Sequence, residues 1–163
     1  MSDTSSATSR DIAANAWVEV DFSPDPGFQL IFDGIHAREE LGRPFLYEID
    51  LSSGTLRGDI GKLVGTSATT WLSQSDVNVE DRFFSGIVTR VVSTGLAGGA
   101  YRYRVEVRPW IWLLTRVTDC RIFQNQSAFQ IITKLFRDAG FSDFKDGRQG
   151  GAGDSVLEYC VQY

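Results

Sequence analysis

The chain has 163 residues, of which 42% are hydrophobic and 23% are charged, and its formal net charge is -5. This length supports one hydrophobic core of ordinary size with a smaller lobe attached. The acidic balance argues against nucleic acid as the main partner, and the absence of a run of about 18 apolar residues argues against a membrane helix.

The first residues read MSDTSSATSRDIAANAW. They lack the basic stretch followed by an apolar stretch that is typical of a secretory signal. Their content of Ser, Thr, Ala and Asp predicts a mobile tail, or an engineered lead-in, over residues 1–15.

In three segments every second residue is apolar and fills one face: Trp17–Phe22, Phe45–Leu51 and Tyr101–Arg108. A period of two residues is typical of a strand with one face buried and one in water. We therefore predict three strands of this kind.

Further strands are predicted with less regular patterns. Residues 83–92 are rich in β-branched residues, and Gly86 within them predicts a bulge or a sharp bend. Residues 66–72 are a weaker strand candidate, and a short strand at 30–35 follows a turn-prone SPDPG. Gly95–Gly99 reads as a hairpin loop between two strands.

A helix is predicted after Ser127, because Ser127 and Gln130 form a capping-box signal. Apolar residues then recur at helical spacing up to Gly140, which suits a left-handed residue after the helix. Residues 60–64 predict a helical turn. A glycine-rich loop at 147–153 precedes a strand, YCVQY, at the end of the sequence; we expect a larger unit to continue there.

The order of these elements predicts a mainly β (α+β) fold. Six strands with short connections favour a small antiparallel barrel, closed or half open, because closure removes exposed sheet edges. We expect a tail over 1–15, the barrel over 16–115, and a partial, helix-containing second lobe over 116–163.

The residue types that carry catalysis or bind metals lack partners at useful spacing. His36 is the only histidine, and Glu39 and Glu40 are adjacent, which points them to different faces. Cys120 and Cys160 have no CxxC context, which argues against a metal site. Because the sequence lacks a secretory signal, we expect two reduced thiols, with a disulfide as the alternative. No metal or other cofactor is expected.

Other reactive candidates fail in the same way. Asp76, Glu80 and Asp81 lie in a polar stretch typical of solvated charges. Ser85 has no nearby general base, and no G-x-S-x-G is present. The glycine-rich stretch from Gly147 lacks the Lys and Ser/Thr of a phosphate loop. We therefore predict that the segment is not an enzyme.

The stretch RPWIWLLTRVTDCRIFQNQS at 108–127 is the most unusual of the chain. If the strand continues past Pro109, Trp110 and Trp112 share one of its two apolar faces. A strand that is apolar on both faces is a core strand, or it has one face against another chain.

The same stretch closely resembles the signature of VgrG proteins, the trimeric spike proteins of the bacterial type VI secretion system. Further segments agree in the same order: GRPFLYEIDL at 42–51, FSGIVTR at 84–90, YRYRVEVRPW at 101–110, SAFQIITKLFRDAG at 127–140 and EYCVQY at 158–163. The resemblance covers residues 16–163.

The resemblance implies a structural hub module without catalytic residues. It implies partners: two further copies in a homotrimer, the hexameric Hcp tube, baseplate components, and an effector or tip protein. Assembly would take place in the bacterial cytoplasm before injection. The candidates for structural or interface roles are Trp110, Trp112, Leu113, Leu114, Arg121, Phe123 and Gln124.

Three other functions stay open on the sequence. A phage baseplate hub would carry the same module, a tail-associated cell-wall hydrolase would need reactive carboxylates, and a barrel could hold a small ligand. Because ring assembly needs large complementary surfaces, we expect residues 1–163 alone to be monomeric or weakly associated.

Overall fold

The computed structural model of the protein describes residues 7–13, 16–54, 59–74, 80–149 and 154–162. Two compact units divide the chain, Met1–Pro109 and Trp110–Tyr163. The division falls earlier than the predicted boundary between residues 115 and 116. Pro109 explains the earlier position, because it has no N–H to extend the sheet.

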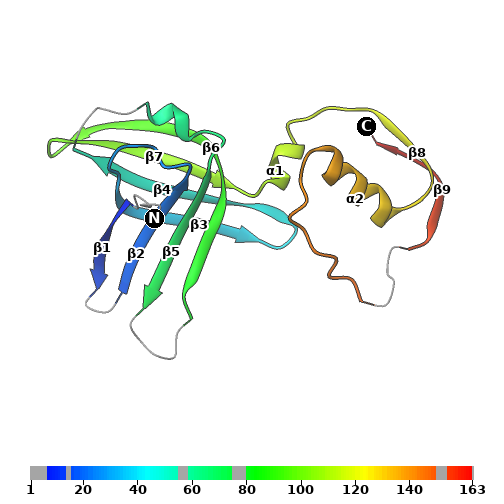
Figure 1. Cartoon of the computed structure of the whole chain (residues 1–163), viewed down its shortest axis with the longest axis horizontal. Coiled ribbons are helices and arrows are strands. Elements are labelled where there is room, and N and C mark those ends of the chain that lie inside the picture. The colour runs from blue at the N-terminus through cyan, green and yellow to red at the C-terminus, as the bar shows by residue number, and fades with distance from the viewer. Residues whose placement is uncertain (1–6, 14–15, 55–58, 75–79, 150–153, 163) are drawn as a thin grey trace. The chain divides into compact units, whose positions relative to one another are not determined.

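The described residues of the first unit form a closed barrel in the order β1-β2-β5-β6-β7-β4-β3 (Figure 1). The strand bounds are Ala7–Ala13 (β1), Ala16–Ser23 (β2), Ile31–Glu40 (β3), Arg43–Ser53 (β4), Ser67–Gln74 (β5), Arg82–Ala97 (β6) and Ala100–Arg108 (β7). Neighbouring strands are antiparallel, except that β1 meets β3 in parallel where Thr8 lies beside Ile31. The predicted mainly β class and antiparallel barrel are confirmed.

The barrel encloses the hydrophobic core. In β2, β4 and β7, alternate residues point inward, as the period of two predicted. The 3-10 helix η1 (Ile60–Leu63), near the predicted turn at 60–64, adds Leu63 to this core. The buried core residues are Val18, Val20, Phe22, Leu30, Phe32, Tyr47, Ile49, Leu51, Leu63, Ala68, Phe84, Val88, Tyr103, Val105 and Val107.

The predicted tail at residues 1–15 contains a strand. Residues Ala7–Ala13 form β1, which pairs with β2 from Ala7 beside Val20 to Ala13 beside Ala16. Residues 1–6 and 14–15 lie outside the described part of the chain. The polar composition concealed β1, because its hydrogen bonds come from the backbone of β2, which composition does not report.

Gly86 was predicted to make a bulge or bend, but the register of β5 with β6 runs through it without a shift. A Cβ at Gly86 would lie 2.6 Å from the carbonyl oxygen of Arg108 and 2.8 Å from Cγ1 of Val107. The glycine is therefore required by the close approach of β7. The bulges of β6 lie between Val88 and Arg90 and between Ser93 and Gly95.

The hairpin between β6 and β7 is tighter than the predicted loop at 95–99. Its turn is Gly98–Gly99, with φ angles of 60° and 78°. Positive φ at both central residues is typical of the two-residue turn that matches strand twist. Gly95, which the sequence placed in the loop, belongs to β6.

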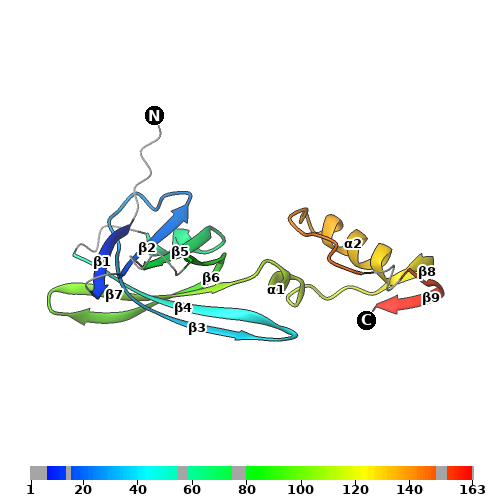
Figure 2. The same cartoon turned by 90° about the horizontal axis from the view of Figure 1, so that it is seen from below.

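The second unit contains α1 (Ile111–Leu114), β8 (Arg121–Ser127), α2 (Ala128–Asp138) and β9 (Val156–Gln162). Strands β8 and β9 form an antiparallel ribbon, and α2 lies along it (Figures 1 and 2). The predicted capping box is confirmed: the Ser127 side chain accepts from the Gln130 N–H, and the Gln130 side chain accepts from the Ser127 N–H. Gly140, with a φ of 85°, follows the helix as predicted.

Candidate functional site

The signature segment, residues 108–127, runs from the end of one strand through a short helix into another strand. Strand β7 ends at Arg108, α1 begins at Ile111, and β8 begins at Arg121. The strand does not continue past Pro109, so the predicted sharing of one strand face by Trp110 and Trp112 is wrong. The N–H of Leu113 donates to the carbonyl of Trp110 at 2.9 Å, which starts a helical turn in its place.

Trp110 belongs to an aromatic cluster of the second unit. Its ring meets Phe136 edge to face at 4.9 Å between centroids and stacks on Phe141 at 4.5 Å. Phe144 meets Phe136 at 5.2 Å and extends the cluster. Such offset and edge contacts are the favourable geometries for aromatic rings. Trp110 therefore has a packing role within its own unit.

Trp112, Leu113 and Leu114 are half-buried members of α1. The guanidinium of Arg116 lies 5.5 Å from the centroid of the Trp112 ring, within the range of a cation–π contact. The Thr115 hydroxyl donates to the Trp112 carbonyl at 2.7 Å and satisfies one carbonyl at the end of this short helix. These contacts fix the backbone around Trp112.

Arg121 links the start of β8 to the end of α2. Its Nε donates to Asp119 at 2.6 Å, and another guanidinium nitrogen donates to Asp138 at 2.8 Å. The hydrogen bond to Asp119 is the main cause that raises the pKa of Arg121. Asp138 also accepts from Lys134, and this hydrogen bond is the main cause that lowers its pKa. A carboxylate at a helix C-terminus is unfavourable alone, and the two cations offset that cost.

Phe123 and Gln124 occupy opposite faces of the β8–β9 ribbon. Phe123 is buried, with 5% exposure, whereas Gln124 is exposed. In the register, Phe123 lies beside Cys160 and Gln124 beside Tyr159. The sequence indicated both as candidates for structural or interface roles, and the structure buries Phe123 and exposes Gln124.

The face of the ribbon that carries Gln124 is largely apolar. Ile122 is 62% exposed, Tyr159 is 56% exposed and Leu157 is 39% exposed. We call these residues, together with Gln124, the ribbon face. Exposed apolar side chains that gather on one sheet face are typical of interaction surfaces. The ribbon face could not be read from the sequence, because it depends on the β8–β9 register.

A polar network in the barrel was also missed. The hydroxyl of Tyr47 donates to Glu39 at 2.6 Å, and Arg82 pairs with the same carboxylate at 2.7 Å. Burial of the Tyr47 hydroxyl is the main cause that raises the pKa of Tyr47, and its hydrogen bond to Glu39 is the second. Ala37 lies beside Tyr47 in the register, and Glu39 follows two residues later on the same face of β3, which brings its carboxylate toward Tyr47. The contact depends on the pairing of β3 with β4, which the sequence does not give directly.

The other reactive candidates remain apart. Glu40 pairs with Arg43 at 3.3 Å, whereas Glu39 pairs with Arg82 at 2.7 Å. His36 is exposed on β3, and Glu80 and Asp81 are exposed, while Asp76 lies outside the described residues. Over the described ranges, no three His, Cys, Asp or Glu side chains gather to hold a metal ion.

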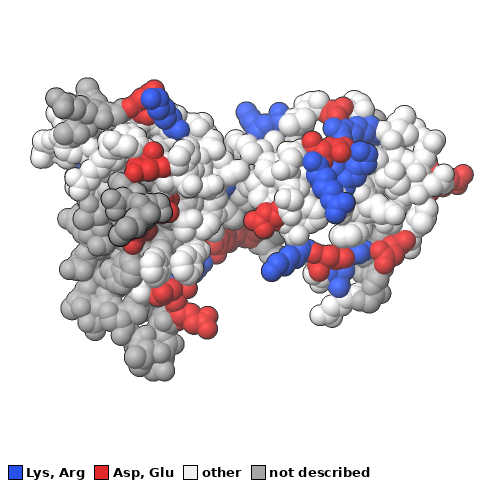
Figure 3. All heavy atoms as spheres, in the orientation of Figure 1, with Lys and Arg blue, Asp and Glu red and all other residues white. Residues whose placement is uncertain are grey.

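Both cysteines, Cys120 and Cys160, are free thiols. Ser85 shares a hydrogen bond of 3.0 Å with Thr69 on the neighbouring strand. Within the part of the chain that the structure describes, no helix has the length and apolar character needed to cross a membrane. On the face drawn in Figure 3, Lys and Arg side chains adjoin Asp and Glu in most places.

Comparison with known proteins places these observations in a family. Residues 38–163 match the family described as phage tail baseplate hub (GPD). The type VI secretion system spike protein VgrG1b of Pseudomonas aeruginosa is 46% identical over 130 residues, which are 79% of this chain and 17% of that protein. VgrG1a of the same organism is 42% identical over 146 residues, which are 90% of this chain and 22% of that protein.

Two solved structures share the fold. The Escherichia coli c3393 protein, a type VI secretion component similar to the bacteriophage T4 tail proteins gp27 and gp5, is 22% identical. Its TM-score is 0.64, over 88% of this chain and 38% of that one. A chain of the Francisella PdpA–VgrG complex is 10% identical with a TM-score of 0.66, over 93% of this chain and 24% of that one. The chain thus spans about a fifth of the length of the curated relatives it matches.

Proposed function

Because the chain belongs to the phage tail baseplate hub (GPD) family, we propose that it is the hub module of a type VI secretion spike protein. The observation that carries this proposal is the identity of 42–46% to curated spike proteins over 79–90% of the chain. A closed barrel with a continuous core is a suitable rigid element for a part that transmits force. In this role the module works by shape and contact, without chemistry of its own.

In the assembled protein, three copies of the barrel would form a ring that docks on the hexameric Hcp tube, with baseplate components and an effector or tip protein as further partners. Assembly would take place in the cytoplasm, before the contractile machine ejects the spike. A phage baseplate hub is the second candidate, because the matching family is described by that function.

We propose to divide the candidate residues between structural and interface roles by their contacts and exposure. Trp110, Arg121 and Phe123 have partners within the second unit. Gln124, on the exposed ribbon face, is the candidate that is free to meet another surface. Trp112, Leu113 and Leu114 are half-buried, and we assign them a structural role at the start of the second unit.

A chimera tests the proposal directly. Residues 1–163 would replace the matching segment of VgrG1b in Pseudomonas aeruginosa, and secretion of the tube protein would be measured in the culture medium. We expect secretion to be retained. A chimera that is stably produced and forms trimers, yet supports no secretion, would overturn the proposed role.

The separated chain provides a second test. Sedimentation of residues 1–163 at micromolar concentration should give a monomer or a weak association, because stable rings need large complementary surfaces. In the chimera, Tyr159→Lys on the ribbon face should reduce the trimer, whereas Ser142→Lys at another exposed position should not. A stable trimer of the isolated chain would contradict this expectation.

A further inference from the structure

A hollow with three arginines among its six lining residues lies at the turn end of the β3–β4 hairpin, which is drawn as a long pair of strands in Figure 2. Its volume is about 250 Å³. Arg38, Glu40, Arg43, Pro44, Leu46 and Arg108 line it. We call it the arginine hollow. It belongs entirely to the first unit.

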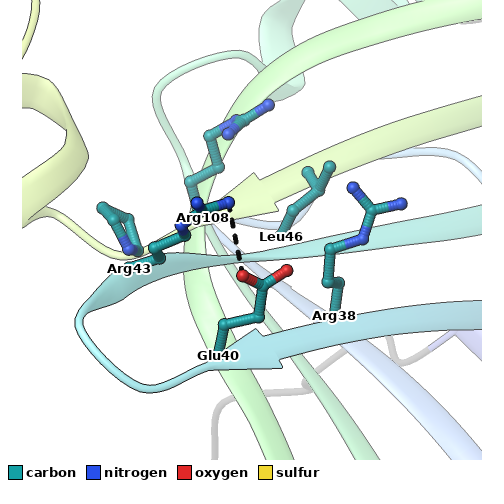
Figure 4. A pocket seen from close by; sticks show the side chains of 6 residues that line it. Arg38, Glu40, Arg43, Leu46 and Arg108 are labelled. Atoms are coloured by element: carbon teal, nitrogen blue, oxygen red, sulfur yellow. Dashed lines mark ion pairs between the residues drawn. The ribbon is translucent and has the colours of Figure 1, made fainter.

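The strand register explains how the arginines come together. Arg38 of β3 lies beside Leu46 of β4. Tyr47 lies beside Val107, so the residues one step further, Leu46 and Arg108, are neighbours on the outer face. Because strands are about 4.8 Å apart, the backbones of Arg38 and Arg108 are about 10 Å apart. Leu46 lies between them (Figure 4).

The charges of the arginine hollow are not balanced. Its lining residues include three arginines and one carboxylate, that of Glu40, which pairs with Arg43 at 3.3 Å. Arg108 pairs with Glu106 at 3.4 Å, and that carboxylate also pairs with Arg90 at 3.1 Å. Arg38 has no ion pair within the described part of the chain.

Arginines further along the same sheet face are matched. Arg104 holds Asp50 with two hydrogen bonds of 2.7 and 2.9 Å, and Arg102 pairs with Asp33 at 3.7 Å. The excess of positive charge is therefore local to the hairpin end. In a chain with a net charge of -5, such a local excess needs an explanation.

We propose that the arginine hollow binds a carboxylate-bearing segment of an acidic partner protein. Guanidinium groups donate paired hydrogen bonds in a plane that matches a carboxylate. Leu46 and Pro44 form an apolar base on which the methylene groups of Asp or Glu can rest. This partner chemistry goes beyond the proposed hub role and does not depend on trimer formation.

The dimensions favour a protein partner over nucleic acid. Nucleic-acid binding needs a track of cations along several phosphates. The arginine hollow offers three guanidiniums in about 250 Å³, and Glu48 and Glu106 lie on the next row of the same face. An isolated pair of carboxylates fits this arrangement, and a polyphosphate chain would meet those two glutamates.

The test uses a fluorescent peptide of alternating Glu and Ser and a matching peptide of Gln and Ser. Binding to residues 1–163 is measured by fluorescence anisotropy at low and at high salt. We expect the Glu peptide to bind at low salt and the Gln peptide to bind at least about tenfold more weakly. High salt should weaken the binding of the Glu peptide.

Variants locate the binding. Arg38→Gln should weaken binding of the Glu peptide by about tenfold, because a charge-assisted hydrogen bond to the peptide is lost. Arg102→Gln removes the same charge from a matched arginine on the same face and should change binding by less than about twofold. Circular dichroism checks that both variants are folded, and Arg43→Gln, at an exposed position, should repeat the Arg38 result.

Three results would overturn the proposal. The first is no difference between the Glu and Gln peptides. The second is an equal loss of binding in Arg38→Gln and Arg102→Gln, which would indicate a general charge effect. The third is tighter binding of a single-stranded oligonucleotide than of the Glu peptide at the same salt. None of these results bears on the chimera, so the two proposals fail separately.

Discussion

The two units of the chain differ in how much of their apolar surface they bury. The barrel has a core of residues such as Val20, Ile49 and Leu51 with no exposure at all, inside a sheet that closes on itself. In the second unit, the buried residues among those described are Phe123, Ser127 and Ile131. The ribbon of β8 and β9 has two open edges and an exposed apolar face.

The difference shows what each unit needs. Burial of apolar surface is the main stabilising term in folding, and the barrel obtains it from its own strands. The second unit relies on a capped helix, an aromatic cluster around Trp110 and ion pairs of Arg121 and Arg148. We infer that the barrel is the stable unit and that the second unit gains from further contacts.

The largest expected effect contrasts two isoleucines. Ile49→Ala in the barrel should lower the free energy of unfolding by about 2–5 kcal/mol, because it leaves a cavity in an enclosed core. Ile122→Ala, at a side chain that is 62% exposed, should change it by less than about 0.5 kcal/mol. Urea denaturation followed by circular dichroism measures both. Equal losses would remove the contrast between the units.

A second substitution tests how tightly the barrel is closed. Gly86→Ala would push a methyl group against the backbone of Arg108, and we expect a loss of about 1–3 kcal/mol, as for other overpacked sites. Gly34→Ala is the control, since a Cβ there meets nothing within 4 Å. Thermal unfolding compares the two. If Gly86→Ala is as stable as Gly34→Ala, β7 can move away from β6.

The strands of the barrel were easier to predict from the sequence than the strands of the second unit, because the barrel has a closed apolar interior. Along residues 45–51 and 101–108, side chains that point into the closed interior alternate with side chains that point outward. Apolar residues therefore recur at every second position, which identifies the strands and their buried face. In the second unit, the capping box at Ser127 was readable because it is local in sequence.

What could not be predicted depends on distant pairing. The ribbon face needs the register of β8 with β9, and the arginine hollow needs three strands whose arginines lie up to 70 positions apart (108 minus 38). The aromatic residues at 110 and 112 suggested a strand. Pro109 has no N–H to continue the strand, and a helical turn follows it instead. The sequence identified the important segment there but not its conformation.

A smaller effect is expected at the cap of α2. Ser127→Ala should cost about 1 kcal/mol, because the N–H of Gln130 loses its acceptor. Ser127→Thr keeps a hydroxyl and should recover most of the loss. Hydrogen exchange of α2 should accelerate in the alanine variant while the barrel strands stay protected. Acceleration across the whole barrel would show that the two units unfold together, which would contradict their separation.

The smallest expected effect concerns acid stability of the second unit. Arg148 donates two guanidinium hydrogen bonds of 2.8 Å to Asp146, and these bonds lower the pKa of that carboxyl from 3.8 to about 2. Because the pKa is depressed in the folded state, the stabilisation is fully present above pH 3.8 and is lost as the pH falls through about 2. Carboxyl titration by NMR should find Asp146 titrating near pH 2.

Arg148→Gln should return the Asp146 pKa toward its ordinary value. The loss of folded-state stability between pH 3.8 and about 2 should then disappear. The barrel resonances should be unaffected, because Arg148 has its ion pairs with Asp146 and Asp154 of the second unit. Asp143→Asn, an exposed change in the same unit, is the control and should leave the titration of Asp146 as it was. An Asp146 that titrates at its ordinary value in the unchanged protein would show that the ion pairs of Arg148 do not hold this loop in solution. The aromatic cluster and the cap would then be the main supports of the second unit.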